Sequence, residues 1–298
     1  GSIITPLKDR IESQITTHYP TSIEIGRMIT EQEARITPEQ RECIRIPVVL
    51  KDLIEEIAFA ARESEFVDKK SGVSARLTIS AYENLYSTAE RRMLRNGENK
   101  TTARVTDFWG VIPALTGKVE MVYEGEQEGP HVVALNIIGA ALKKVFLQYF
   151  PNPNKLKKGQ ERDPFGVVKA WFAGGNTVDL FTDLPGKQFF LELDQVAGLK
   201  KVTETAGIDE LEIYTFMELA LHGLAEFEVL SKEFVQTKWV FKDFLTGNLK
   251  DDDDDETEDK NDAQDAPSKR PQEKPSTFHF PVEDGGSCSP FPTSPIWI

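Results

Sequence analysis

Two arginines in the first third of the sequence are the residues whose surroundings best suit chemistry. Arg76 ends the turn 71–76, where small residues and one glycine separate two segments with helical periodicity. Arg10 follows Leu-Lys-Asp shortly before a stretch with strand-like composition. A guanidinium is planar, permanently charged and able to bind phosphate through two hydrogen bonds. Each arginine could therefore present a cation at a fixed point. Two simpler roles remain open, an ion pair or carbonyl contact for Arg76 and a surface ion pair with Asp9 or Glu12 for Arg10.

Other motifs that carry chemistry are missing from the sequence. The Gly-Lys pairs at 117–118 and 186–187 lack the remaining residues of a phosphate-binding P-loop, and neither H-E-x-x-H nor G-x-S-x-G occurs. Four glutamates alternate through the loop 118–129, without a histidine or aspartate at ligand spacing. This composition favours a solvated acidic loop over a metal site.

Composition and charge exclude several classes of protein. The 298 residues carry a net charge of −14, and residues 251–298 contribute 13 acidic and 4 basic residues, a net of −9. The remaining −5 leaves no basic surface for nucleic acid, so no nucleic-acid partner is expected. No secretory signal and no membrane span are apparent. Cys43 and Cys288 lie far apart, which indicates no disulfide framework and is typical of the reducing cytoplasm.

Hydrophobic periodicity predicts a mainly α protein that begins with the edge of an α/β domain. Residues 37–117 carry the pattern of a helical bundle, whereas residues 251–298 have the acidic and Pro/Ser-rich composition of a disordered tail. At the N-terminus we expect a short helix 6–12, a strand 14–19, and a helix capped by Thr21 and Glu24 with Ile25, Met28 and Ile29 on one side. In the bundle we expect a short helix from Pro38, long helices 49–64 and 80–96, the latter with a Ser80/Glu83 capping box, and a segment from Thr106 bent by Pro113.

Residues 130–250 are expected to form a second helical domain. Its longest element is a helix from Pro130 to about Phe150, ended by two prolines. We further expect a short helix 164–172, an extended segment 177–182, helices 185–206 and 209–232, and a short strand or helix at 239–245. The 209–232 helix is apolar nearly all round, which predicts a central position.

The two arginine segments resemble one known family. Residues 5–11 with the strand and proline after them, and residues 71–77, are similar to the end of an AAA+ ATPase module of the magnesium chelatase ATPase-subunit and MoxR type. The resemblance covers residues 1–129 and extends to about 247. It implies that Arg10 is an arginine finger, which reaches the nucleotide of a neighbouring subunit, and that Arg76 is the sensor 2 arginine. The Walker A and B motifs of the family would precede Gly1, so ATP and Mg²⁺ are expected only with that N-terminal core.

The resemblance also implies a domain plan and a function. Under it the chain is the C-terminal part of a cytoplasmic ATPase that forms homo-oligomeric rings and remodels, or inserts metal into, an unidentified protein partner. The fragment alone would be inactive. The alternative is a non-enzymatic helical module for protein interaction, with an acidic tail. The expected parts are the edge of the AAA+ α/β core (1–36), the helical lid (37–117), the acidic loop (118–129), the family-specific helical domain (130–250) and the disordered tail (251–298).

Overall fold

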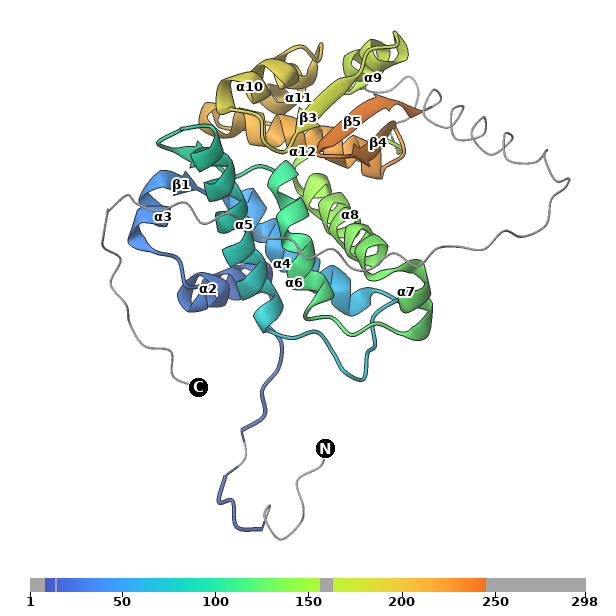
Figure 1. The fold of residues 1–298 in the computed structure, drawn as a ribbon. Coiled ribbons are helices and arrows are strands. Elements are labelled where there is room, and N and C mark those ends of the chain that lie inside the picture. The colour runs from blue at the N-terminus through green and yellow to red at the C-terminus, as the bar shows by residue number, and fades with distance from the viewer. Residues whose placement is uncertain (1–8, 14, 156–162, 245–298) are drawn as a thin grey trace, which may run out of the picture. The chain divides into compact units, whose positions relative to one another are not determined.

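The computed structural model describes residues 9–13, 15–155 and 163–244, which form a mainly α structure with two small sheets (Figure 1). The prediction of a mainly α protein is therefore confirmed. All of these residues belong to one compact unit, Gly1–Glu256. The predicted helix start at Thr5 and Pro6 and the predicted disordered tail lie outside the described residues.

The first half of the fold is built on two long antiparallel helices. Helix α4 (Val48–Glu63) and helix α5 (Arg76–Arg95) bury the faces that periodicity predicted, including Leu53, Ile57 and Leu85. The shorter elements around them are α2 (Ile23–Glu33), α3 (Pro38–Cys43), the 3₁₀ helix η1 (Thr106–Val111), α6 (Ile112–Thr116) and α7 (Tyr123–Glu128). Helix α3 begins as expected, because Thr37 and Gln40 cap each other's backbone N–H groups.

The expected elements at the N-terminus are only partly present. Residues 9–12 are not helical, and residues 15–19 form no strand. The strand prediction was wrong because a strand needs a neighbour to accept its backbone hydrogen bonds, and none of the described strands pairs with this segment. The next helix, α2, is capped by Ser22 instead of Thr21. An edge of an AAA+ α/β core is not established by these residues.

Helix α2 also turns a different face inward than the sequence suggested. Gly26 and Thr30 are its buried residues, whereas Ile25, Ile29 and especially Met28, at 68% exposure, face outward. Periodicity shows which residues share a face but not which face a neighbouring element covers. The apolar side of α2 is therefore its outer face.

Two further expectations in this half need correction. Helix α5 begins at Arg76, one turn before the predicted Ser80, because Leu77 is fully buried and draws the first turn into the core. The predicted acidic loop contains the short helix α7, whose Gly125 lies against the Phe66 carbonyl where a Cβ would come within 2.7 Å. Pro113 does interrupt its segment, since η1 gives way to α6 there.

The second half combines helices with an antiparallel sheet. Helices α8 (Pro130–Tyr149) and α12 (Ile213–Glu226) pack against each other, and α12 is buried nearly all round, as predicted. The smaller helices are α9 (Gly166–Ala173), α10 (Gly186–Asp194), α11 (Leu199–Thr205) and the 3₁₀ helix η2 (Glu210–Glu212). The strands are β3 (Val178–Phe181), β4 (Leu230–Val235) and β5 (Lys238–Asp243), in the order β3-β5-β4.

The prediction for residues 130–250 underestimated the strand content and the number of helix breaks. The predicted helix 209–232 ends at Glu226, because the chain reverses at Glu228 (φ 59°) and continues as β4. The predicted helix 185–206 is divided at Gly198, which has φ +83° and lies close to Val167. The extended segment at 177–182 is present as β3, and the segment expected at 239–245 as a strand or a helix is the strand β5.

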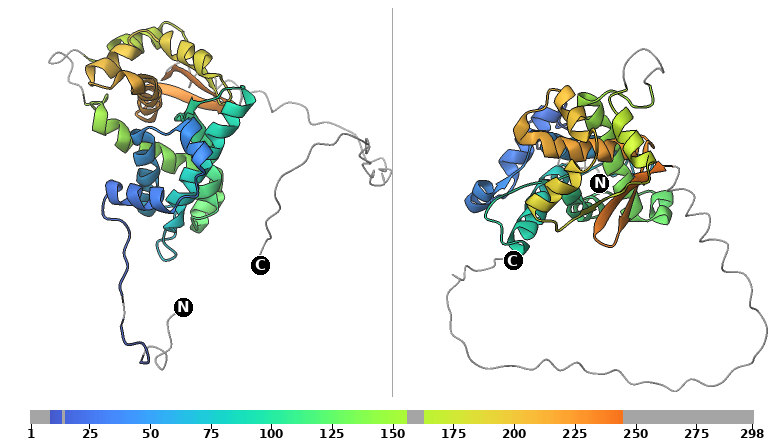
Figure 2. Two further views of the ribbon diagram at one scale, coloured as in Figure 1. Left: turned by 90° about the vertical axis from the view of Figure 1, so that its left-hand side faces the viewer. Right: turned by 90° about the horizontal axis from the view of Figure 1, so that it is seen from above.

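Contacts between the two halves are extensive. Helix α4 packs on α8, so the predicted lid and the predicted second domain share one hydrophobic core. Figure 2 shows the sheet beside α12, in agreement with the contacts between α12 and β4. Among the described residues, one helix, α8, is long enough and apolar enough to cross a membrane. Half of its most apolar 18-residue stretch (50%) is buried inside the fold. Its buried stripe packs on α4 and α12, as expected for a core helix.

The first sheet is a two-strand clip at the base of the helical pair. Strand β1 (Ile44–Arg45) precedes α4, and strand β2 (Thr101–Thr102) follows α5. They pair in parallel, Ile44 opposite Thr101 and Arg45 opposite Thr102.

Candidate functional site

The turn 71–76 joins α4 to α5 and is held in place from several sides. Asp68 accepts hydrogen bonds from the Lys70 N–H at 2.8 Å and the Ser71 hydroxyl at 3.1 Å. The Lys70 N–H is the main reason that the pKa of Asp68 is lowered. On the other side, Val73 forms a β-bridge with Val119. The turn is therefore a fixed structure.

Gly72 is required in this turn for two reasons. Its φ of +72° is the left-handed conformation that side chains disfavour, and a Cβ would lie 2.8 Å from the Tyr19 hydroxyl. That hydroxyl accepts a hydrogen bond from the Val73 N–H at 3.1 Å, and the Arg62 guanidinium lies 4.1 Å above the Tyr19 ring. Tyr19 thereby anchors the N-terminal segment to the turn that precedes Arg76.

Arg76 is the first residue of α5, and its side chain is exposed. Its backbone N–H donates to the Ser74 hydroxyl at 3.2 Å, but Ala75 at the cap position offers no side-chain acceptor to the helix. No ion pair or side-chain hydrogen bond is found for the Arg76 guanidinium within the described part of the chain. The carbonyl-capping and ion-pair roles considered for Arg76 thus have no support there.

A guanidinium at this position is electrostatically unusual. The N-terminus of a helix carries partial positive charge, so a cationic side chain there is unfavourable until an anion binds. Helix α5 is 20 residues long, and next to its start lies a shallow pocket of about 300 Å³. Residues 71–75, Tyr19, Lys118 and Glu120 line this pocket, whereas Arg76 follows the last of the lining turn residues. Phosphate oxygens would find backbone N–H groups, a serine hydroxyl and cationic side chains together at this helix end.

Arg10 is exposed in a turn at the beginning of the described chain. The described residues between 9 and 20 run outward from α2 as an extended trace (Figures 1 and 2). No described hydrogen bond, ion pair or pocket joins Arg10 to Arg76. The structure therefore does not bring the two arginines into one site, and it gives Arg10 no ion pair with Asp9 or Glu12 among the described contacts.

The residues here fit the phosphate part of ATP but not Mg²⁺. Helix α5 begins with the Arg76 cation, and the pocket beside it offers serine hydroxyls and the Lys118 ammonium group, next to the Glu120 carboxylate. Within residues 9–13, 15–155 and 163–244, no group of three or more histidine, cysteine, aspartate or glutamate side chains could hold a metal ion. We therefore derive no step through Mg²⁺.

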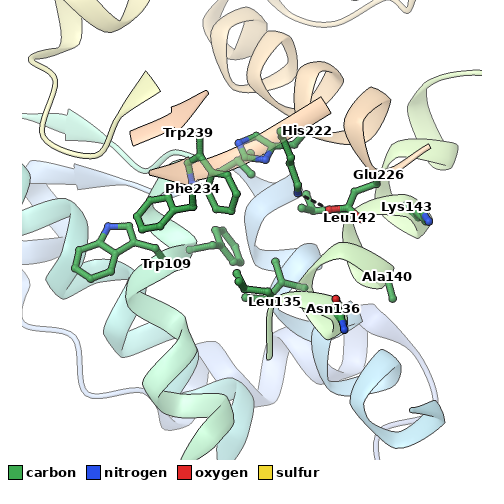
Figure 3. A pocket seen from close by; sticks show the side chains of 14 residues that line it. Trp109, Leu135, Asn136, Ala140, Leu142, Lys143, His222, Glu226, Phe234 and Trp239 are labelled. Carbon is green, nitrogen blue, oxygen red and sulfur yellow. Dashed lines mark hydrogen bonds and ion pairs between the residues drawn. The ribbon is translucent and has the colours of Figure 1, made fainter. Parts of the chain in front are cut away.

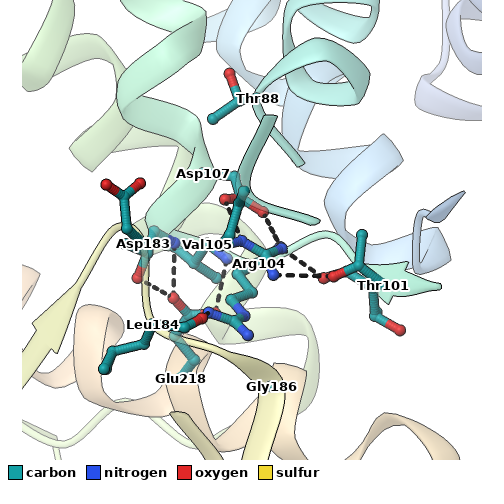
Figure 4. A network of polar contacts seen from close by, with 12 residues as sticks. Thr88, Thr101, Arg104, Val105, Asp107, Asp183, Leu184, Gly186 and Glu218 are labelled. Atoms are coloured by element: carbon teal, nitrogen blue, oxygen red, sulfur yellow. Dashed lines mark hydrogen bonds and ion pairs between the residues drawn. The ribbon is translucent and has the colours of Figure 1, made fainter. Parts of the chain in front are cut away.

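Sequence reasoning missed a buried polar network near the C-terminal end of α5, the end opposite Arg76 (Figure 4). Arg92 donates to Asp107 through Nε at 3.1 Å and Nη2 at 2.9 Å, and also to the Thr102 carbonyl. Glu218 on α12 accepts from the backbone N–H groups of Val105 at 2.7 Å and Thr106 at 2.6 Å. The network fastens η1 both to α5 and to α12.

Burial governs the electrostatics of this network. It raises the pKa of Glu218 to about 7 against the opposing effect of the hydrogen bonds from Thr106 and Val105. It also lowers the pKa of Arg104 to about 10. The Arg104 guanidinium donates to the Leu184 carbonyl at 2.7 Å and lies 4.0 Å above the Phe189 ring. A single glutamate within the apolar segment 213–224 is the sequence signal that could have revealed this network.

Comparison of the chain with family models, with curated proteins and with solved structures finds no match in any of the three. The site must therefore be judged from its own geometry.

Proposed function

We propose that this chain is the C-terminal part of an AAA+ ATPase of the magnesium chelatase and MoxR type, with Arg76 as sensor 2 and Arg10 as arginine finger. The observation that carries the proposal is the exposed Arg76 guanidinium at the start of α5, which has no side-chain partner among the described residues. A helix end with this charge is stabilised when it binds an anion such as a nucleotide phosphate. Arg10 lies exposed in a segment that runs outward, and in the proposal it acts in trans on a nucleotide held by the next subunit.

The chemistry of phosphoryl transfer fits these roles. The reaction depends chiefly on positioning and on stabilising negative charge, and an arginine finger accelerates it by roughly 10³–10⁵-fold. Here Arg76 would bind the phosphates from the same subunit, and Arg10 would bind the developing charge from the next subunit. The proposal includes a homo-oligomeric ring, a cytoplasmic location, ATP and Mg²⁺ bound with a P-loop core, and an unidentified protein partner that is remodelled or receives a metal.

The decisive experiment joins this chain to the P-loop module that the proposal requires and measures ATP hydrolysis. Arg10→Ala should abolish turnover but keep ATP binding, whereas Arg76→Ala should weaken the response to nucleotide. Lys69→Ala, at an exposed position two residues before this turn, is the matched control and should hydrolyse ATP normally. Wild-type turnover in both arginine variants would show that these assignments are wrong.

A mixing experiment separates action in trans from action in cis. Subunits with Arg10→Ala retain a working P-loop, and subunits with an inactivated P-loop retain Arg10. Mixed rings should regain part of the activity that each parent lacks, because the finger of one subunit would serve the nucleotide of the next. The chain alone should not bind ATP in calorimetry; binding at micromolar ATP would contradict the requirement for a P-loop core.

The outer face of α2 favours a second candidate, a helical module for protein interaction without enzymatic activity. Ile25, Met28 and Ile29 form a row of exposed apolar side chains on this helix. Such a row is typical of a surface that another protein covers. A reading frame upstream that encodes no P-loop would favour this candidate over the ATPase.

A further inference from the structure

A second site lies away from both arginines, in the pocket between η1, α8, α12 and the β4–β5 hairpin (Figure 3). Its volume is about 650 Å³, within the range of pockets that hold small molecules and cofactors. Aromatic side chains supply much of the wall, including Trp109 from η1 and Phe234 and Trp239 from the hairpin. Planar apolar molecules pack well against such walls.

One wall of the pocket carries a buried histidine that lacks hydrogen bonds. His222 on α12 is 2% exposed, and neither ring nitrogen has a partner among the described residues. Its ring instead meets Trp239 and Phe241 edge to face, with centroids 5.4 Å and 5.0 Å away. Trp109 lines the same pocket, and its buried Nε1 also lacks a partner. Because buried polar atoms are almost always hydrogen-bonded, two such groups on one pocket indicate a ligand that supplies the missing partners.

The charges around the pocket favour an uncharged ligand. Glu226 and Lys232 form an ion pair with each other, and Lys143 points away from the aromatic rings in Figure 3. Burial, with a smaller effect from Lys232, holds the pKa of His222 well below its usual value. The imidazole is therefore neutral and offers one donor and one acceptor. A charged ligand would lose its hydration at this wall without gaining an opposite charge.

We propose that this pocket binds a small, uncharged aromatic molecule that bears a hydroxyl group, with the hydroxyl on His222 and the ring against Trp109, Phe234 and Trp239. The hydroxyl can donate to one imidazole nitrogen or accept from the other, so either ring tautomer is served. The site is independent of the nucleotide function proposed above, since it shares no residue with the 71–76 turn.

Three related probes test the proposal on the whole chain. 2-Naphthol carries the ring and the hydroxyl, naphthalene lacks the hydroxyl, and 2-naphthoate replaces it with a charge. Isotope-labelled histidine allows the imidazole signals to be followed by NMR while each probe is titrated. We expect 2-naphthol to shift the His222 signals and to bind about tenfold more tightly than either analogue, a factor equal to about 1.4 kcal/mol.

Variants of His222 separate the hydrogen bond from the shape of the pocket. His222→Phe keeps an aromatic ring and should bind 2-naphthol about tenfold more weakly. His222→Gln keeps a donor and an acceptor and should retain most of the affinity. His131→Phe, at an exposed position of α8, is the matched control and should bind like the original chain.

Three results would overturn the proposal. They are a lack of any His222 shift with saturating 2-naphthol, equal affinity for 2-naphthol and naphthalene, or unchanged 2-naphthol affinity in His222→Phe. The comparison of the two probes needs no variant, so it decides the matter even where a substitution prevents folding.

Discussion

Arg92 and Asp107 form a two-point ion pair in which the side chains are 1% and 0% exposed. Both guanidinium–carboxylate hydrogen bonds, at 2.9 and 3.1 Å, lie inside the fold. Oδ2 of Asp107 also accepts a hydrogen bond from the backbone N–H of Arg104 at 2.9 Å. A charge so deeply buried is tolerated because each ion satisfies the other. The pair therefore makes the attachment of η1 to α5 sensitive to the loss of either partner.

Removing one partner of this pair should be costly. Asp107→Asn leaves the Arg92 charge buried without its counter-ion, and we expect a loss of about 3–5 kcal/mol in the free energy of unfolding. Urea denaturation measures this loss. The exposed pair of Arg95 and Asp183 is the matched control, and Arg95→Met should change stability by less than about 1 kcal/mol. Equal effects at the two pairs would show that burial of the Arg92–Asp107 pair is not decisive.

Glu218 should make stability depend on pH near neutrality. Its pKa is about 7 in the folded chain and near 4.5 in the unfolded chain, so between these values the folded state holds a proton that the unfolded state has released. This contribution to stability is fully present below about pH 4.5 and is lost as pH rises through about 7. Glu55, with a pKa raised to about 7 by burial, acts in the same direction.

A variant isolates the part that belongs to Glu218. We expect the unfolding free energy of the original chain, relative to Glu218→Gln, to fall by up to about 3 kcal/mol between pH 4.5 and pH 8. Denaturation curves at a series of pH values give this difference directly. A difference that stays constant or increases with pH would contradict a raised pKa for Glu218.

Gly26 should be difficult to replace even though it lies in a helix. A Cβ at this position would lie 2.3 Å from Oε2 of Glu55. The other carboxylate oxygen of Glu55, Oε1, accepts a hydrogen bond from the Thr30 hydroxyl at 2.6 Å, which holds the side chain in place. Gly26→Ala should therefore destabilise the contact between α2 and α4 by about 1–3 kcal/mol. Gly166→Ala is the control, because its Cβ would meet nothing nearer than 3.8 Å, and its effect on the denaturation midpoint should be small.

Arg76 should lower the stability of the folded chain, because its positive charge lies at the start of α5. Replacing it with aspartate puts a negative charge at the start of α5 and should raise the unfolding free energy by about 0.3–1 kcal/mol. Thermal unfolding at low ionic strength measures the gain, and added salt should reduce it. A clear loss of stability in Arg76→Asp would reveal a structural role and count against the phosphate-binding proposal.

The sequence predicted best the elements whose burial follows directly from periodicity. Helices α4, α5 and α8 each have one continuous apolar stripe, and a stripe of this kind specifies both the helix and its inner face. Helix α2 shows where this reasoning stops, because Ile25 and Met28 share a face that no described element covers. Chain reversals such as that at Glu228 depend on a single backbone angle and leave the apolar pattern unbroken.

The candidate sites were only partly accessible to sequence reasoning. The sequence located the turn before Arg76, since small residues between two periodic segments indicate a turn. It could not identify the partners of Arg92 or His222, because charged and aromatic residue types do not reveal which long-range neighbours they meet. Those contacts arise from the packing of α5, η1, α12 and the hairpin.

The parallel clip of β1 and β2 has a mechanical consequence. The pairing joins the residues just before α4 to the residues just after α5. The turn before Arg76 lies at the opposite, C-terminal end of α4. Helix α4 has 16 residues and is therefore about 24 Å long, at a rise of 1.5 Å per residue. Because α4 also packs on α8 within the shared core, the β1–β2 pairing and the core together hold the turn before Arg76 at the far end of this helix.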